Sequence, residues 1–289
     1  MSIISNLVQI LFIISFLLTL YILACLAIIL IFAKLPRNNV DEKPDWGVIK
    51  EERIPTINGK SLECWIVNPE ITKKKYPAIV LIHGWGRNRG RMVSRARIYA
   101  KSGFTTILFS ARDHGESSKE RFGMSIIKFS EDLDAVIDWW GKPVVICGHS
   151  IAGGATLLVG SRNPLVKAII AESPPISFPH DFRHVYRPAL RRLTSIFIPG
   201  ITLVVLLIFR RFHNNDYSPI EVAKRITIPT LIIIGKKDDI FPYRSAELLK
   251  SKVPNCQLWF PEDGTHYNLE DLPDYGSRTF TFLQDNGVL

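Results

Sequence analysis

The chain has 289 residues, of which 47% are hydrophobic and 22% charged, a composition that allows a packed core and argues against global disorder. Beyond an apolar stretch near the start, roughly 250 residues remain, which suits one large α/β domain. The formal net charge is +9. No lysine-rich block or nucleic-acid motif accompanies this charge, so we expect no nucleic-acid partner.

Arginines gather beside apolar stretches rather than in basic blocks. They are Arg183, Arg187, Arg191, Arg192, Arg210 and Arg211. This arrangement fits contact with an anionic lipid surface, and a solvated basic surface is the alternative. The four cysteines show neither C-x-x-C nor Cys/His metal spacing. We therefore expect no disulfide framework and no metal site, and the sequence implies no cofactor.

Residues Leu7–Ala33 form a nearly unbroken apolar run, in which Gln9 is the one strongly polar side chain. With a helical rise of about 1.5 Å per residue, this run is long enough to cross a hydrocarbon core of about 30 Å. A signal peptide would have a basic start and a shorter apolar region. The pattern therefore predicts an uncleaved transmembrane anchor over residues 1–35.

A polar linker is expected at 36–46, after the anchor. Lys34, Arg37 and Lys43 follow the apolar run, and nothing basic precedes it. The positive-inside rule then predicts a single-pass membrane protein whose catalytic domain lies in the cytoplasm.

The remaining residues, 47–289, are expected to form one domain that starts with a β-hairpin. Two strand patterns, Val48–Ile57 and Leu62–Val67, flank the dipeptide Asn58-Gly59. Asn-Gly supplies the positive φ angles that a tight hairpin turn needs.

Apolar runs rich in β-branched residues follow the hairpin and alternate with helical patterns. Such runs are typical of a parallel sheet that is covered on both faces. The expected strands are Ala78–Ile82, Phe104–Phe109, Val144–Cys147, Ala168–Ala171, Thr230–Ile234 and Gln257–Phe260.

The clearest helical pattern is Ser130–Trp140, which has an apolar face at helical spacing and Ser130 in position to cap it. Ala246–Lys250 and Asp271–Leu283 are weaker helical patterns. An antiparallel start followed by βαβ alternation predicts an α/β fold with a mostly parallel, doubly wound sheet.

The alternation breaks at residues 175–218, which we interpret as a cap insertion. This stretch holds the arginines and an apolar run, Ile196–Phe209, interrupted by Pro199-Gly200. The run is too short to span a bilayer comfortably. Two interpretations remain open: the cap dips into the membrane, or its helix is buried against the domain.

The strand expected at Val144–Cys147 runs into the segment GHSIAGG at 148–154, and a helical pattern follows. In this motif the chain resembles the α/β-hydrolase superfamily, whose pattern G-x-S-x-G exposes a nucleophilic serine at a sharp strand-to-helix turn. Small neighbours are needed because the serine backbone is strained and the flanking chains pass closely. Ala152 stands where the second glycine is usual. The resemblance implies that Ser150 is the nucleophile.

The resemblance also implies two donors for an oxyanion hole. The amide of Ile151 would be one, at a helix N-terminus that favours negative charge, and such a donor is worth roughly 3–4 kcal/mol in the transition state. The other would be the amide of Trp85, in the loop HGWG at 83–86 that follows the Ala78–Ile82 strand. A plain glycine turn is the alternative for this loop.

The acid and the base follow in the chain order of the superfamily. The segment GKKDDIFP at 235–242 resembles its acid turn and implies that Asp238 is the acid, although Asp239 is adjacent and Glu172 occupies a position that some members use. The segment DGTHYNL at 263–269 implies that His266 is the base.

Two further histidines, His114 and His149, are interpreted as structural. His114 belongs to the segment at 109–117, which resembles the D-x-R-G-x-G-x-S loop of the same superfamily. His149 is part of the serine turn and is expected to pack rather than react.

The resemblance covers roughly residues 45 to 285 and implies a serine hydrolase that transfers an acyl group to water through an acyl-enzyme. The anchor and the apolar cap favour a carboxylic ester or thioester with a lipophilic acyl group. The expected partners are thus an ester substrate and the membrane, contacted through the N-terminal helix and the cap. A serine peptidase and a non-catalytic membrane-associated scaffold remain the alternatives.

Overall fold

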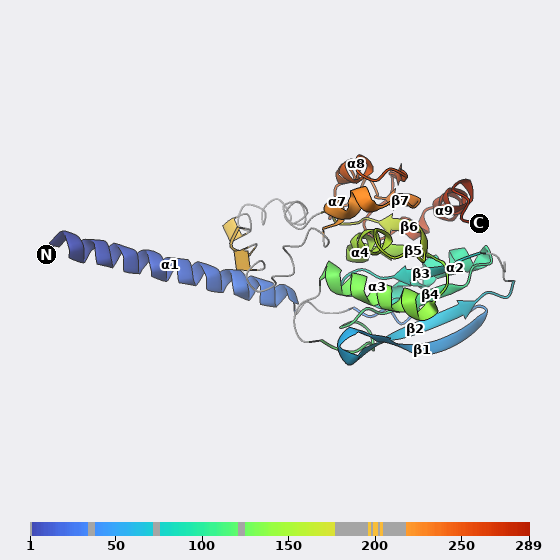
Figure 1. Ribbon diagram of the computed structural model, residues 1–289, viewed down its shortest axis with the longest axis horizontal. Coiled ribbons are helices and arrows are strands. Elements are labelled where there is room, and N and C mark those ends of the chain that lie inside the picture. The colour runs from blue at the N-terminus through green and yellow to red at the C-terminus, as the bar shows by residue number, and fades with distance from the viewer. Residues whose placement is uncertain are drawn as a thin grey trace.

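The computed structural model describes residues 2–33, 38–71, 76–120, 125–176, 196–197, 199–201, 203–204 and 218–289. Most of the expected cap insertion at 175–218, including all of its arginines, lies outside the described residues. Helix α1 (Ser2–Ala33) projects from a rounded α/β domain like a rod (Figure 1). Its stretch Ile4–Leu30 is long and apolar enough to cross a membrane.

An eight-stranded sheet in the order β1-β2-β4-β3-β5-β6-β7-β8 forms the centre of the domain. β1 and β2 pair antiparallel, β2 pairs antiparallel with β4, and all later neighbours are parallel. The expected strands and the α/β-hydrolase fold are therefore confirmed. The strands are β1 (Val48–Thr56), β2 (Lys60–Asn68), β3 (Ala78–Ile82), β4 (Thr106–Phe109), β5 (Val144–His149), β6 (Val166–Glu172), β7 (Thr230–Ile233) and β8 (Cys256–Trp259).

The hairpin between β1 and β2 turns at the expected dipeptide. Asn58 and Gly59 adopt φ angles of 58° and 66°, inside a short 3₁₀ turn named η1 (Ile57–Gly59). Asn and Gly are the residues that enter this left-handed region at least cost.

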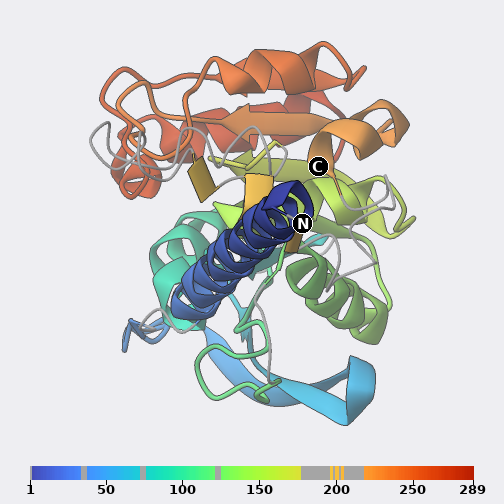
Figure 2. The same ribbon diagram turned by 90° about the vertical axis from the view of Figure 1, so that its left-hand side faces the viewer.

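Helices cover both faces of the sheet, and two apolar cores result. Helices α2 and α9 pack on one face, whereas α3, α4, α7 and α8 pack on the other. Figure 2 shows α2 and α3 on opposite sides of the sheet. The helices are α2 (Val93–Lys101), α3 (Ile126–Trp140), α4 (Ile151–Gly160), α7 (Pro219–Val222), α8 (Ser245–Lys250) and α9 (Tyr275–Asp285), with short 3₁₀ turns η2 (Arg89–Met92), η5 (Ala223–Arg225) and η6 (Leu269–Asp271).

The prediction that Ser130 caps α3 is wrong. The helix begins one turn earlier, and the Ser125 hydroxyl accepts a hydrogen bond from the Lys128 amide at 3.3 Å. Ser130 is buried inside the helix, and its hydroxyl donates to the Ile127 carbonyl. The apolar face continues through Ile127 and Phe129, both buried, and this burial extends the helix toward its N-terminus.

Candidate active site

Ser150 lies at the sharp turn between β5 and α4, with φ 58° and ψ −126°. A non-glycine residue is strained in this conformation. The neighbouring chain leaves no room for side chains: a Cβ atom on Gly148 would lie 2.5 Å from the Ala152 carbonyl oxygen, and one on Gly153 would lie 2.8 Å from the Glu172 carbonyl oxygen. The sequence therefore folds here into a tight elbow with Ser150 at its tip.

His266 lies after β8, and its imidazole contacts the carboxylate of Asp238, which follows β7. The His266 Nδ1 atom is 3.0 Å from Asp238 Oδ2. Both side chains are almost completely buried. A carboxylate at Nδ1 fixes the proton on that nitrogen and leaves Nε2 unprotonated in the neutral ring, so that Nε2 can act as a base.

Asp238 is held as a carboxylate by four donors. In addition to His266, the Ser173 hydroxyl donates to Oδ2 at 2.6 Å, and the amides of Ile240 and Phe241 donate to Oδ1 at 2.9 and 2.8 Å. Burial alone would raise the pKa of Asp238, but these hydrogen bonds outweigh it and lower the pKa below its usual value.

The structure distinguishes Asp238 from Asp239 and Glu172, the two other carboxylates that the sequence offered as the acid. Asp239 is exposed. Glu172 is fully buried, and its carboxylate is bound by Arg95 Nε at 2.8 and 3.0 Å and by the Tyr275 hydroxyl. Glu172 thus serves a buried ion pair and does not contact His266.

Two further groups support the acid and the base, and one of them, Ser173, could not be predicted from motifs. Ser173, which binds Asp238, has a φ angle of 43° directly after β6, and a lone serine at a strand end gives no sequence signal. The His149 ring lies 4.8 Å from that of His266, centroid to centroid, and its Nε2 is 2.7 Å from the His266 carbonyl oxygen. His149 therefore connects the elbow to the loop of the base, which fits its expected packing role.

The loop at 83–86 lies directly against the elbow. A Cβ atom on Gly84 would be 3.1 Å from the Cβ of Ser150, so this glycine permits the close approach that brings the next residue, Trp85, beside the serine. Ile151 begins α4, and the first amides of a helix have no partner within the helix. Both expected oxyanion donors thus belong to backbone segments next to Ser150.

Two buried histidines hold this loop in place. His83 Nδ1 donates to the Gly84 carbonyl at 2.7 Å, while its Nε2 accepts from the Ala111 amide at 3.1 Å. His114 Nε2 accepts from the Gly86 amide at 3.1 Å. Burial, together with the neighbouring His114, lowers the pKa of His83 well below its usual value, so the ring stays neutral. These contacts agree with the structural role expected for His114.

Ser150 is partly exposed, while His266 is buried. In the described part of the chain, no hydrogen bond joins the Ser150 hydroxyl to His266. Catalytic hydrogen bonds of this kind often tighten only in the complex with substrate. Nucleophilic acyl transfer needs a serine at a helix N-terminus, an imidazole oriented by a carboxylate and backbone amides close to the serine, and these segments supply all three.

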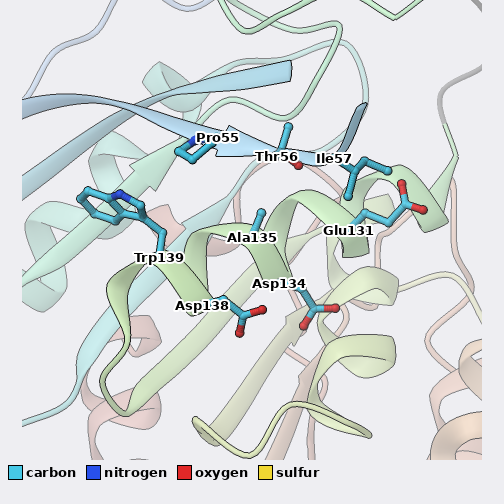
Figure 3. Close-up of a pocket in the computed structure, with 8 residues that line it drawn as sticks. All are labelled: Pro55, Thr56, Ile57, Glu131, Asp134, Ala135, Asp138 and Trp139. Atoms are coloured by element: carbon cyan, nitrogen blue, oxygen red, sulfur yellow. The ribbon is translucent and has the colours of Figure 1, made fainter. Parts of the chain in front are cut away.

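A surface hollow of about 620 Å³ lies elsewhere, between the end of β1 and α3 (Figure 3). Two of its carboxylates pair with basic side chains, Glu131 with Arg112 at 2.7 Å and Asp134 with Arg162 at 2.6 Å, and the third, Asp138, accepts from the Asn163 side-chain amide at 3.1 Å. None of the expected site residues lines it. The lining residues are Pro55, Thr56, Ile57, Glu131, Asp134, Ala135, Asp138 and Trp139. Over the described ranges, no three His, Cys, Asp or Glu side chains gather in a way that could hold a metal ion.

The fold and the elbow define an α/β-hydrolase. A family model described as serine aminopeptidase, S33, matches residues 73–219, just over half of the chain. The chain belongs to this family and is a hydrolase.

Comparison with known proteins shows a likeness to esterases and lipases. A bifunctional esterase/perhydrolase of Acinetobacter calcoaceticus is 25% identical over 225 residues, which cover 61% of this chain and 81% of that protein. A Pyrococcus furiosus esterase shares the fold, with a TM-score of 0.68, 20% identity and coverage of 86% of this chain and 98% of its own. A bacterial membrane phospholipase A gives a TM-score of 0.61 at 16% identity over 99% of this chain and 98% of its own, so its fold match extends to α1.

Proposed function

We propose that the chain is a membrane-anchored serine hydrolase that cleaves a carboxylic ester or thioester with a lipophilic acyl group. The observation that carries this proposal is the His266–Asp238 hydrogen bond of 3.0 Å, formed beside the strained elbow of Ser150. The likeness to an esterase/perhydrolase supports ester cleavage. The long apolar helix α1 supports a substrate that partitions into membranes.

The proposed reaction runs through an acyl-enzyme. Ser150 Oγ attacks the carbonyl carbon of the ester while His266 Nε2 takes the serine proton. The amides of Trp85 and Ile151 donate to the oxyanion of the tetrahedral intermediate. When this intermediate collapses, the leaving alcohol or thiol takes the proton from His266.

Water then completes the cycle. His266 removes a proton from the water molecule as it attacks the acyl-enzyme, and it returns that proton to Ser150 when the carboxylic acid departs. Asp238 remains ionised throughout, because its four donors stabilise the carboxylate. It keeps the imidazole in the required tautomer and stabilises the imidazolium.

The test is labelling of the detergent-solubilised full chain by a fluorophosphonate probe, which reacts with activated serines. We expect labelling of the wild type and none of Ser150→Ala. Ser277→Ala, which removes an exposed serine hydroxyl on α9, is the matched control and is expected to label normally. A folded wild type that does not label would overturn the serine hydrolase proposal.

Cleavage of a peptide bond is the second candidate, because the matching family is described as serine aminopeptidase. The two candidates differ in the bond that is broken, not in the catalytic residues. Release of naphthylamine from aminoacyl β-naphthylamides, measured beside release of nitrophenol from p-nitrophenyl acyl esters, separates them. Turnover of the esters by the unlabelled wild type without turnover of the naphthylamides supports the first proposal, and turnover of the naphthylamides supports the second.

We further propose that α1 spans the membrane as an anchor of residues 1–35, with a linker at 36–46 and the catalytic domain at 47–289 on the cytoplasmic side. The apolar length of α1 supports the span, and the basic residues Lys34, Arg37 and Lys43 after it support the orientation. Protease accessibility of the domain in sealed vesicles of known orientation tests the topology.

A further inference from the structure

The segment that follows α1 is hydrogen-bonded to the loop that carries Trp85. The Asn38 amide donates to the Gly86 carbonyl at 2.8 Å. Val40 exchanges two hydrogen bonds with the Asn88 side chain, at 2.9 and 3.2 Å. A Cβ atom on Gly90 would lie 2.0 Å from the Val40 carbonyl oxygen, so the two segments are in direct contact. Residues 38–40 are therefore attached to the loop and do not act as a loose tether.

The same segment is fixed further along the chain. Arg97 of α2 pairs with Asp45 at 3.0 Å and with Glu42 at 3.5 Å. Five residue steps separate Ala33, the last residue of α1, from Asn38, and an extended chain covers at most about 18 Å in five steps. The candidate oxyanion loop consequently lies near the end of α1, whatever path the intervening residues take.

The apolar run of the cap touches the same helix. The Tyr21 hydroxyl of α1 donates to the Ile196 carbonyl at 2.6 Å and accepts from the Gly200 amide at 3.1 Å. A Cβ atom on Gly200 would lie 2.5 Å from both Cys25 Sγ and the Tyr21 ring. Cys25, Ile201 and Val204 form a small buried apolar cluster. Figures 1 and 2 both show these short pieces of residues 196–204 beside α1.

This contact bears on the two interpretations of the apolar run. Tyr21 and Cys25 lie within Ile4–Leu30, the stretch that would cross a membrane. The run beside them still exposes large apolar side chains, with Ile196 62% and Leu203 49% exposed. The described part of the run thus packs on the anchor and presents apolar surface outward, as expected of a segment that meets lipid.

We propose that α1, the linker segment 38–40 and the cap run 196–204 hold the opening of the Ser150 site against the bilayer, so that the enzyme takes acyl esters resident in the membrane. The inference rests on the proposed ester hydrolysis and on α1 spanning the membrane. A long acyl chain can then stay in apolar surroundings while its ester group reaches Ser150. If the opening faced water, the acyl chain would have to leave the bilayer and pass through water to reach the site.

The experiment compares two substrates with the full chain reconstituted in phosphatidylcholine vesicles. One is p-nitrophenyl acetate, which is soluble in water, and the other is a fluorogenic oleoyl ester dissolved in the bilayer. In the first variant, ten Gly/Ser residues are inserted between Ala33 and Asn38, which keeps the contacts of residues 38–40 but lengthens the connection between α1 and the domain. We expect the rate on the oleoyl ester to fall at least tenfold and the rate on the acetate to stay within twofold.

A second variant acts through the cap alone. Gly200→Leu forces the cap run away from Tyr21 and Cys25, and it is expected to cause the same selective loss on the oleoyl ester. The same ten-residue insert placed between Ile71 and Tyr76, away from the linker, is the matched control and should change neither rate. If the first insertion lowers both rates, it has disturbed the oxyanion loop, and Gly200→Leu then decides.

The outcomes separate this inference from the proposed function. Hydrolysis of the oleoyl ester at the wild-type rate by both variants would overturn the membrane-facing opening and leave ester hydrolysis standing. A wild type that cleaves neither ester would overturn the proposed function, and with it this inference.

Discussion

His83 and His149 are buried imidazoles, and the hydrogen bonds of His83 require the neutral ring. His83 accepts a hydrogen bond from the Ala111 amide, which a doubly protonated ring could not do. Burial lowers the pKa of both side chains well below the usual value, and electrostatic repulsion from His114 on His83, and from His266 and Arg95 on His149, adds to the effect. The two residues that position the oxyanion loop and the base loop are therefore sensitive to acid.

The stability of the protein should fall as the pH drops below about 6.5. Below that value the unfolded state binds protons at His83 and His149 and the folded state does not, so the free energy of unfolding decreases by about 1.4 kcal/mol per pH unit for each histidine. His83→Gln keeps one donor and one acceptor but cannot titrate, and it should reduce the slope between pH 6 and pH 4 by about 1.4 kcal/mol per pH unit.

Denaturant unfolding in detergent at a series of pH values measures this slope. Asp238 does not affect this slope, because its pKa is lowered in the folded protein. Its contribution to stability is fully present above about pH 4 and is lost only as the pH falls further. Lys101→Gln, at an exposed position on α2, is the control and should leave the slope unchanged. Parallel curves for wild type and His83→Gln would contradict a neutral buried His83.

A second prediction at the residue scale concerns which carboxylate, that of Asp238 or that of Glu172, is the acid. Asp238→Asn should keep the fold but leave His266 in the wrong tautomer, and kcat for ester hydrolysis should drop by about 10⁴-fold. Glu172→Gln should act on stability instead, because it removes the charge of one of the two carboxylates that pair with the buried Arg95, at a cost of about 3–5 kcal/mol. Measuring kcat beside the unfolding midpoint distinguishes the two effects, and a large loss of kcat in folded Glu172→Gln would reverse the assignment.

At the scale of elements, the β5–α4 elbow depends on backbone contacts that admit no added atoms. Gly148→Ala would place a methyl group against the Ala152 carbonyl oxygen, which is backbone and cannot move aside without displacing α4. We expect fluorophosphonate labelling to fall more than tenfold. The reciprocal control, Ala152→Gly, restores the usual second glycine of the elbow motif and should label like the wild type. Normal labelling of Gly148→Ala would contradict this prediction, because it would mean that the turn has room for a methyl group.

Elements with a regular apolar pattern could be predicted from the sequence, and those that break the pattern could not. The parallel strands are continuous buried runs, so their positions follow from composition alone. Helix α2 is not predicted, because its inward face carries Arg95, a charge that is buried only because Glu172 and Glu270 pair with it from distant parts of the chain. The start of α3 is missed because Ser130 looks like a cap, while the helix begins after Ser125.

The same reasoning applies to the site. Ser150, Asp238 and His266 follow strands in motifs, so their neighbourhood could be predicted once the sheet was known. Ser173 could not, because its role depends on β6 and β7 lying side by side, which brings its hydroxyl to Asp238. The substrate pocket could not be predicted either, since the cap at 175–218 interrupts every periodic pattern.

At the scale of the whole molecule, the chain joins a domain with an apolar core on each face of its sheet to a helix whose apolar side chains are exposed. The side chains of α1 from Ile4 to Leu20 are exposed, although most of them are apolar. An exposed apolar surface of this length is what a transmembrane helix presents to lipid, which supports the proposed anchor.

We therefore expect the chain to remain with membranes through alkaline carbonate extraction. Replacing Phe16 and Leu17 together by Arg should release it, because each arginine costs about 2.5–3.5 kcal/mol at the centre of a transmembrane helix. Ile71→Arg, at a 77% exposed position of the domain, is the control and should stay membrane-bound. Extraction of the wild type into the soluble fraction would show that α1 does not span the bilayer.

The left-handed backbone of Ser150 affects which residue evolution favours at this position. Its φ of 58° costs a serine about 1–3 kcal/mol, a penalty that glycine does not bear. Under the proposed function, selection for stability and selection for chemistry therefore favour different residues at this one position. In a descendant of this protein, glycine at the elbow would mark a lineage that has lost acyl transfer and become more stable by the same substitution.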